Sequence, residues 1–276
     1  MSPRPPARSS WSKAVKVTWE EACLALLTRR PRDIRRIYLM PERLTDFADI
    51  VAWASAHKVP LDPAPRDALA RLADTMHHDG ILFVAERPRP ASLAKVLEGL
   101  SASEPLSLVL ADGIKNPNNL GAIARVCAYF GVPHLLTCGD SAGYSDAALR
   151  TSQGAAELVT LAPLDDATRA IAQLKQRGIA VVATSPHARE TLARVKLPAR
   201  SLMLVGSENA GLSPAIERLA DHVVAIPGSG ALESLNVAVA LSIVLWEHWR
   251  SWRLGDSRPW RPNSDGPDVN SSAPDP

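Results

Sequence analysis

Residues 228–247 read GSGALESLNVAVALSIVLWE, a glycine-containing loop that runs directly into an apolar helix pattern. Ser234 and Asn236 stand where this helix should begin, and side-chain oxygens often cap the free backbone N–H groups at such a position. A capping role is the simplest explanation for Ser234. The same arrangement, a polar loop beside an apolar run, occurs twice more in the chain.

One of these loops is DGIKNPNNLGAIARV, residues 112–126, which follows the predicted strand LSLVLA. We expect a helix to begin near Asn119, with Asn118 or Asn119 as its cap. Gly121 allows another backbone to come close. Arg125 lies well inside this otherwise apolar helix, so its guanidinium either extends to solvent or is directed at an anion.

The other loop is LMLVGSENAGLSP, residues 202–214, in which a strand runs into Gly206. It lacks the Lys-Ser/Thr of a P-loop, and GSGALE lacks the third glycine of a dinucleotide fingerprint. These absences argue against nucleotide hydrolysis and nicotinamide chemistry. Glu208 either caps the helix expected near Pro214 or belongs to a site at the end of the strand.

Taken together and in this order, the three loops resemble the motifs of the SpoU (TrmH) family of RNA ribose methyltransferases. The matching residues are Asn119, Gly121 and Arg125 in the first motif, Gly206, Glu208, Gly211 and Leu212 in the second, and Ile226, Pro227, Ser234, Leu235, Asn236 and Val237 in the third. A single cap explains each loop separately, but three motifs in family order favour a common site.

The resemblance implies an α/β fold of the SPOUT type, with a parallel sheet and a C-terminal deep trefoil knot. Proteins of this family bind S-adenosylmethionine in the knot and work as homodimers, with the RNA at the subunit interface. By analogy, the cofactor would be held around Leu204, Gly206, Gly211, Ile226 and Leu235.

The resemblance also implies a catalytic set, namely Asn119, Arg125, Glu208, Ser234 and Asn236. The family transfers a methyl group to a ribose 2′-hydroxyl, which requires in-line placement and stabilisation of the oxygen as its proton leaves. A guanidinium seldom gives up its proton. Arg125 is therefore expected to grip a phosphate and stabilise the developing alkoxide, while Asn119 and Glu208 hold its geometry.

Alternating strand and helix patterns over residues 105–253 predict a parallel sheet covered on both faces, and this is the expected catalytic domain. Residues 13–87 form a smaller α/β pattern similar to an L30e-like RNA substrate-binding domain. Residues 88–104, rich in Pro and Ser, are the expected linker and contain one possible helix. The segments 1–12 and 254–276 have the composition of disordered arms.

The net charge of +2 neither requires nor excludes a nucleic-acid partner. Residues 1–36, however, contain nine basic and three acidic side chains, a +6 excess that is able to hold phosphates or simply to face solvent. Three cysteines without metal-type spacing, no apolar run of membrane-spanning length and no signal peptide indicate a cytoplasmic protein that binds neither membrane nor metal.

The sequence therefore predicts an S-adenosylmethionine-dependent methyltransferase that modifies a ribose 2′-hydroxyl in structured RNA. The additional N-terminal domain favours rRNA, while tRNA stays open. Two alternatives remain: a knotted RNA-binding module that binds the cofactor without turnover, and a relative that methylates a base.

Overall fold

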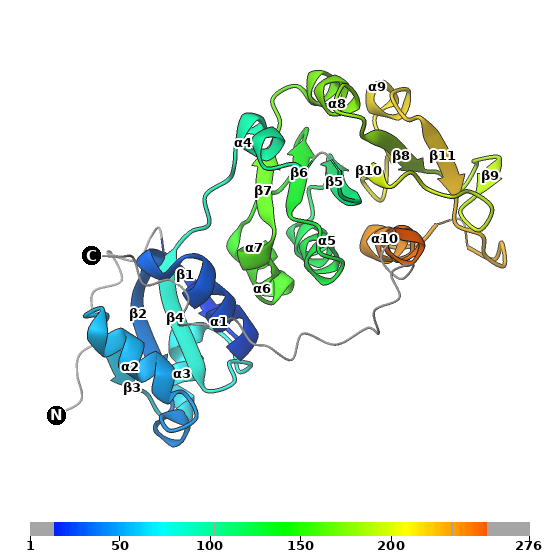
Figure 1. Ribbon diagram of the computed structural model, residues 1–276. Helices are drawn as coiled ribbons and strands as arrows, with labels where there is room; N and C mark the ends of the chain where they lie inside the picture. Colours follow the sequence, from blue (N-terminus) through cyan, green and yellow to red (C-terminus); the bar gives the residue numbers. More distant parts are fainter. Residues whose placement is uncertain (1–13, 102, 233, 253–276) are drawn as a thin grey trace. The chain divides into compact units, whose positions relative to one another are not determined.

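The computed structural model describes residues 14–101, 103–232 and 234–252, which form two compact units divided between Pro88 and Arg89 (Figure 1). The segments 1–12 and 254–276, expected to be disordered, lie outside the described residues. Among the described residues, no helix is both long and apolar enough to span a membrane.

The first unit contains a four-stranded sheet in the order β1-β4-β2-β3. Its strands are β1 (Ala14–Thr18), β2 (Ile34–Leu39), β3 (Leu61–Pro63) and β4 (Ile81–Glu86), and its helices are α1 (Glu20–Arg29), α2 (Ala48–Ala56) and α3 (Arg66–Ala73), with short 3₁₀ turns at Pro31–Asp33 and Pro41–Arg43. β4 runs antiparallel to β1 and β2, whereas β3 is parallel to β2. The side chains of residues 81–85 are all buried, as expected for a central strand covered on both faces.

The second unit is built on a seven-stranded sheet in the order β7-β6-β5-β10-β8-β11-β9, in which every pair is parallel. Its strands are β5 (Leu106–Asp112), β6 (His134–Cys138), β7 (Thr160–Pro163), β8 (Ala180–Thr184), β9 (Glu190–Thr191), β10 (Arg200–Gly206) and β11 (His222–Ala225). Its helices are α4 (Leu93–Glu98), α5 (Pro117–Tyr129), α6 (Asp146–Ser152), α7 (Ala155–Leu158), α8 (Ala167–Lys175), α9 (Pro214–Glu217) and α10 (Val237–Trp252). The predicted parallel α/β sheet is confirmed.

Alternating side chains of the central strands divide the core of this unit into two layers, because successive residues of a strand face opposite sides of the sheet. Val109 of β5 and Met203 of β10 pack with the helices α5 and α10. Leu108 and Leu202, one residue earlier in each strand, pack on the other face with α4 and α8. Figure 1 shows α5 and α10 on one side of the sheet and α8 on the other.

The final helix, α10, buries one stripe of side chains spaced three or four residues apart. This stripe includes Val237, Leu241, Val244 and His248, and it packs against α5 and β10. The helix thus covers β10 and begins at the edge where the sequence motifs lie. The trefoil knot remains an expectation from the family resemblance.

The segment 88–104, expected as a linker, contains helix α4, which is part of the second unit. Ser92 caps this helix by accepting a hydrogen bond from the Lys95 N–H, and Val96 is completely buried in the core. The backbone N–H of Ala91 also donates to the Leu161 carbonyl oxygen, 2.8 Å away. The second unit therefore begins well before the first residue of β5.

Candidate functional site

The three sequence motifs meet at the carboxyl ends of β5 and β10. These strands are parallel neighbours whose last residues, Asp112 and Gly206, are paired in register. The chain continues from one into α5 and from the other into the loop that carries Glu208. Ligands of parallel sheets bind at this edge, where loops from adjacent strands converge.

The side chain of Asn236 joins all three motifs by hydrogen bonds. Its amide nitrogen donates to Oε1 of Glu208 at 2.7 Å and to Oδ1 of Asn119 at 3.3 Å. Its own oxygen accepts from the backbone N–H of Ala238 at 3.0 Å, which orients the amide group. Segments 117 residues apart in sequence are thereby linked through one side chain at an exposed surface.

The capping residues differ from those expected. α5 begins at Pro117, and its cap is Asn116, whose side chain accepts from the Asn118 N–H, so neither Asn118 nor Asn119 is the N-cap. α10 begins at Val237, and the capping hydrogen bond comes from Asn236 instead of Ser234. Each cap lies two or three residues from the position expected from the sequence, because composition does not mark helix ends to the residue.

Ser234 and Glu208 therefore have different surroundings from those that simple capping would give. Ser234 is exposed and forms no hydrogen bond with any described residue. Glu208 does not cap the short helix α9, because Ser213 precedes that helix and the Glu208 carboxylate accepts from Asn236 instead.

Gly206 lets the chain cross closely over the end of β10. A Cβ atom at this position would lie 2.1 Å from the carbonyl carbon of Gly211 and 2.3 Å from the backbone nitrogen of Leu212. Ser207 and Gly211 close the loop by exchanging two backbone hydrogen bonds, of 3.1 and 2.8 Å. The absence of a side chain at Gly206 thus serves the folding of this loop directly.

The other residues expected around the cofactor lie at different depths. Leu204 is fully buried in the core, and Ile226 is half-buried beside the α5–α10 layer. Leu235 is 46% exposed. Gly211 has a left-handed backbone, with φ of 65°, and a Cβ there would meet nothing within 4 Å, so open space lies above it.

Gly121 serves the packing of α5 against α6. A Cβ at this position would lie 2.5 Å from the carbonyl oxygen of Ala148 and 2.7 Å from the Thr151 side chain. The Thr151 hydroxyl also donates to Oδ1 of Asn118 at 3.0 Å. The glycine therefore fixes α5, and with it the helix position from which Arg125 projects.

Arg125 is exposed on α5 and forms no hydrogen bond or ion pair with the described residues. The helix buries the neighbouring Ile123 and Ala124 against the sheet and leaves the guanidinium in solvent. Arg125 is not joined to the Asn119–Glu208–Asn236 network, so these residues do not hold it by direct contact. A cation without a protein partner remains free to bind an anion.

Asp112 is a site residue that the sequence analysis did not identify. Its side chain is only 8% exposed, and Oδ2 accepts from the Ser213 N–H at 2.7 Å, just beyond the Gly206–Leu212 loop. Oδ1 accepts from the thiol of Cys138 at 3.4 Å. Burial, together with this carboxylate, raises the pKa of Cys138 to about 12. The only sequence signal was an acidic residue that ends a buried strand.

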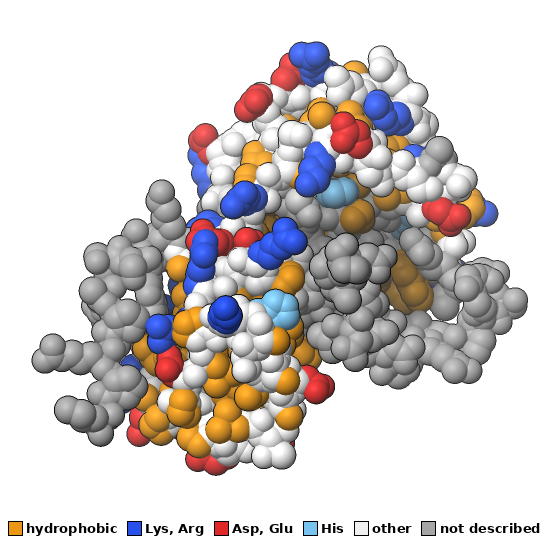
Figure 2. Space-filling view, turned by 60° about the vertical axis from the view of Figure 1, so that its left-hand side comes forward, with side chains coloured by type: hydrophobic (Ala, Val, Ile, Leu, Met, Phe, Trp, Pro, Cys, Tyr) orange, Lys and Arg blue, Asp and Glu red, His pale blue; other side chains and the backbone are white. Residues whose placement is uncertain are grey.

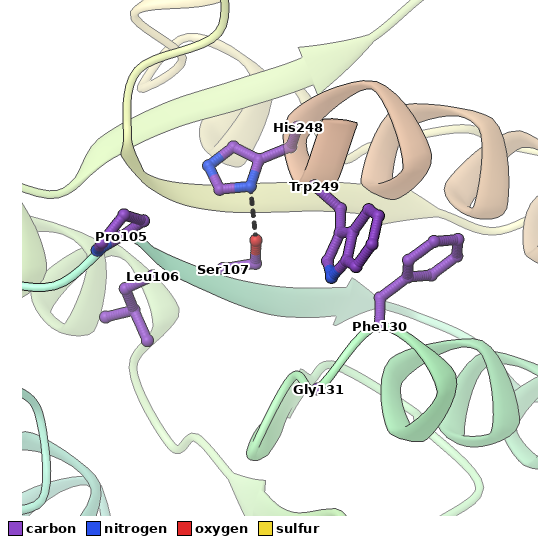
Figure 3. Close-up of a pocket in the computed structure, with 7 residues that line it drawn as sticks. All are labelled: Pro105, Leu106, Ser107, Phe130, Gly131, His248 and Trp249. Atoms are coloured by element: carbon purple, nitrogen blue, oxygen red, sulfur yellow. Dashed lines mark hydrogen bonds between the residues drawn. The ribbon is translucent and has the colours of Figure 1, made fainter. Parts of the chain in front are cut away.

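A small pocket lies at the opposite edge of the sheet, at the amino end of β5 (Figure 3). Here the Ser107 hydroxyl lies 2.9 Å from Nδ1 of His248, and Nε2 of the same ring lies 3.0 Å from the Pro198 carbonyl oxygen. The carbonyl can only accept, so Nε2 carries a proton and donates it to this hydrogen bond. This cluster ties α10 to the sheet and is separate from the motif residues.

No group of three or more His, Cys, Asp or Glu side chains in the described part of the chain is arranged to hold a metal ion.

Family models match both units of the chain. Residues 106–246 match the SpoU rRNA methylase family, and residues 20–91 match the domain described as RNA 2′-O ribose methyltransferase substrate binding. These matches cover the second unit from β5 into α10 and most of the first.

Relatives and solved structures extend over most of the chain. A protein of Nitrosomonas europaea named 23S rRNA (guanosine-2′-O-)-methyltransferase RlmB is 34% identical, covering 83% of this chain and 88% of its own. An uncharacterized tRNA/rRNA methyltransferase of Mycobacterium avium is 35% identical, covering 77% and 68% respectively.

The fold is shared with AviRb of Streptomyces viridochromogenes, a SpoU methyltransferase solved in complex with the cofactor AdoMet. The TM-score is 0.71 at 22% identity, over 91% of this chain and 95% of that one. On the family model and the level of identity to its relatives, the chain belongs to the SpoU rRNA methylase family.

Proposed function

We propose that this protein methylates the 2′-hydroxyl of a ribose in rRNA. It is an RNA 2′-O-methyltransferase of the SpoU family, and its cofactor is S-adenosylmethionine. The observation that carries the proposal is the hydrogen-bonded meeting of Asn119, Glu208 and Asn236, one residue from each family motif. The names of relatives such as the Nitrosomonas europaea protein favour a guanosine of 23S rRNA over tRNA as the target.

The residues present fit this cofactor. At Gly113, Gly211 and Gly228, in the loops at this edge, a Cβ would meet nothing within 4 Å, so the backbone is open to a ligand. The exposed Glu208 carboxylate provides negative charge beside this space. Open glycine backbone beside a carboxylate suits a ligand that carries positive charge and makes close main-chain contact.

S-adenosylmethionine supplies a methyl group on a positively charged sulfur. We propose that Asn236, held by Glu208 and Asn119, orients the reacting groups, and that Ser234 contacts the ribose or the cofactor from its exposed position. Arg125 keeps its proton, binds a phosphate next to the target ribose and stabilises negative charge on the 2′-oxygen, whose proton passes to solvent water.

We propose that the active form is a homodimer, with RNA bound where the two copies meet. α10 leaves Val239 and Trp246 48% and 47% exposed, and α5 leaves Tyr129 81% exposed. Large exposed apolar side chains on neighbouring helices are typical of a surface covered by a partner. Arg125 lies four residues before Tyr129 and therefore on the same side of α5, next to this surface. Trp246→Glu should convert a dimer to monomers in light scattering, whereas a monomeric wild-type protein would contradict the proposal.

The test is transfer of a labelled methyl group from S-adenosylmethionine to unmodified rRNA and tRNA, followed by nucleoside analysis. We expect a 2′-O-methylnucleoside in rRNA. Arg125→Ala should lower turnover about 100- to 1,000-fold, by analogy with the loss of one group that stabilises an oxyanion. Its cofactor affinity and Tm should be unchanged, because Arg125 is exposed and has no partner among the described residues.

The matched control is Arg169→Ala, which removes an exposed arginine from α8 on the opposite face of the sheet. Its turnover should equal that of the wild type. Full activity in Arg125→Ala would contradict the role proposed for this residue. Cofactor binding without transfer to either RNA would favour the knotted binding module, and a methylated base would identify the third alternative.

A further inference from the structure

Charge is strongly segregated within the first unit. Its described residues, 14–88, contain eleven basic and eleven acidic side chains and are therefore neutral as a whole. One region has a net charge of +3, because it holds six arginines and three carboxylates. It consists of residues 29–36 and 86–88, with Asp62. The remaining residues of the unit hold five basic and eight acidic side chains, a net charge of −3. A neutral domain thus has one markedly basic region.

Strand pairing brings this basic region together at one end of the sheet. Ile34, at the start of β2, pairs with Ala85 near the end of the antiparallel β4. Arg29 ends α1, directly before the turn that leads into β2. We call this region, formed by residues 29–36 and 86–88, the arginine end. In the lower part of Figure 2, Lys and Arg side chains (blue) stand towards the upper edge and Asp and Glu (red) lie along the lower edge.

The basic N-terminal segment joins the domain at the same end. Ala14, the first residue of β1, pairs with Glu86 of β4. The thirteen residues before it contain Arg4, Arg8 and Lys13 and no acidic residue.

Five of the six arginines of this end fall into two groups. Arg30 pairs with Asp33 at 2.6 Å, Arg35 pairs with Glu86 at 2.8 Å, and Arg36 pairs with Asp62. Arg29 and Arg32 are exposed and form no hydrogen bond or ion pair with any described residue. The paired residues stabilise the end of the sheet, while these two present guanidinium groups to solvent.

We propose that the arginine end is the surface through which the first unit holds the phosphate backbone of the RNA substrate, with Arg29 and Arg32 as direct phosphate contacts. This inference rests on the proposed function, because it takes RNA as the substrate. Unpaired guanidinium groups bind phosphate bidentately and release its counterions, which makes the affinity dependent on salt but not on sequence. The acidic remainder of the unit repels phosphate and so orients the domain.

The experiment measures binding of the full chain to an unmodified 23S rRNA transcript over 50–200 mM salt, for wild type, Arg29→Gln/Arg32→Gln and a matched control. The control, Arg66→Gln/Arg71→Gln, also removes two exposed arginines from the first unit, but from α3, which follows the carboxyl end of β3. Methyl transfer to the same transcript is measured in parallel, with the KM for RNA and kcat determined separately.

We expect the slope of log affinity against log salt to become shallower by about 1.4 to 1.8 in Arg29→Gln/Arg32→Gln, from roughly 0.7 to 0.9 per phosphate contact. The ratio of the wild-type affinity to the affinity of this variant then falls about tenfold between 50 and 200 mM salt. The KM for RNA should rise while kcat stays unchanged, and the control should keep the wild-type slope.

Equal slopes for wild type and Arg29→Gln/Arg32→Gln would overturn the inference, as would an equal change in the control. Failure of the proposed function is distinguishable: a wild type that binds RNA with a steep salt slope and transfers no methyl group would refute the enzyme and leave the arginine end as an RNA surface.

Discussion

Substitution of Gly206 by alanine provides the sharpest test of how the candidate site is built. The new Cβ would lie 2.1 Å from the carbonyl carbon of Gly211, whereas ordinary contact begins at 3.4 Å. The difference, 3.4 − 2.1, requires a displacement of about 1.3 Å, and the atoms in the way are backbone, which has no alternative rotamer. The loop that carries Glu208 must therefore move.

The expected cost has two parts. Overpacking of a tight backbone contact costs about 1–3 kcal/mol. The displaced loop also withdraws the Ser213 N–H from the buried Asp112 carboxylate, and an unsatisfied buried acceptor costs a further 1–3 kcal/mol or so. A total of roughly 2–6 kcal/mol corresponds to a Tm at least about 4 °C below that of the wild type.

The assays are thermal unfolding and equilibrium binding of S-adenosylmethionine. If binding of S-adenosylmethionine has to return the displaced loop to its wild-type position, each 1.4 kcal/mol that this return requires weakens the cofactor affinity about tenfold. The control is Gly99→Ala, at the end of α4, where a Cβ meets only ordinary contacts at 3.7 Å and φ is −80°. A Gly206→Ala protein with the Tm and cofactor affinity of Gly99→Ala would refute this account of the loop.

Three other expectations concern the same edge of the sheet. Glu208→Ala and Asn236→Ala should be non-additive in kcat/KM, with a coupling of about 0.5–3 kcal/mol in a double-mutant cycle, because their side chains share a 2.7 Å hydrogen bond; additive effects would contradict it. Asp112→Ala should raise the KM for S-adenosylmethionine more than it lowers kcat, and Asp112→Asn, which keeps an acceptor, should recover part of the loss; an unchanged KM would exclude Asp112 from loop positioning. Burial raises the thiol pKa of both Cys127 and Cys138, in the latter case to about 12, so at pH 8 both thiols stay protonated and should resist iodoacetamide until the protein unfolds. Alkylation of either residue in the native protein, detected by mass spectrometry, would show that its burial is not maintained.

Short continuous apolar runs predicted the strands of the second unit well. LSLVLA and the strand that runs into Gly206 correspond to β5 and β10 of the parallel sheet, because strands buried on both faces must be apolar at every position. In the first unit, β1 and β3 contain no such continuous apolar run. They are the two edge strands of the sheet, and pairing with β4 and β2 orders their backbones. Thr18, which ends β1, also resembles a helix cap in sequence.

The parallel α/β architecture and the family could both be predicted from the sequence alone. Hydrophobic periodicity and the residues within each motif are local properties, which the sequence shows directly. Only the tertiary structure decided which motif side chains meet. Asn236 contacts Asn119 across 117 residues, and Arg125 stands apart from both. Asp112 and the arginine end likewise emerge from strand register, which brings together residues that sequence separation keeps apart.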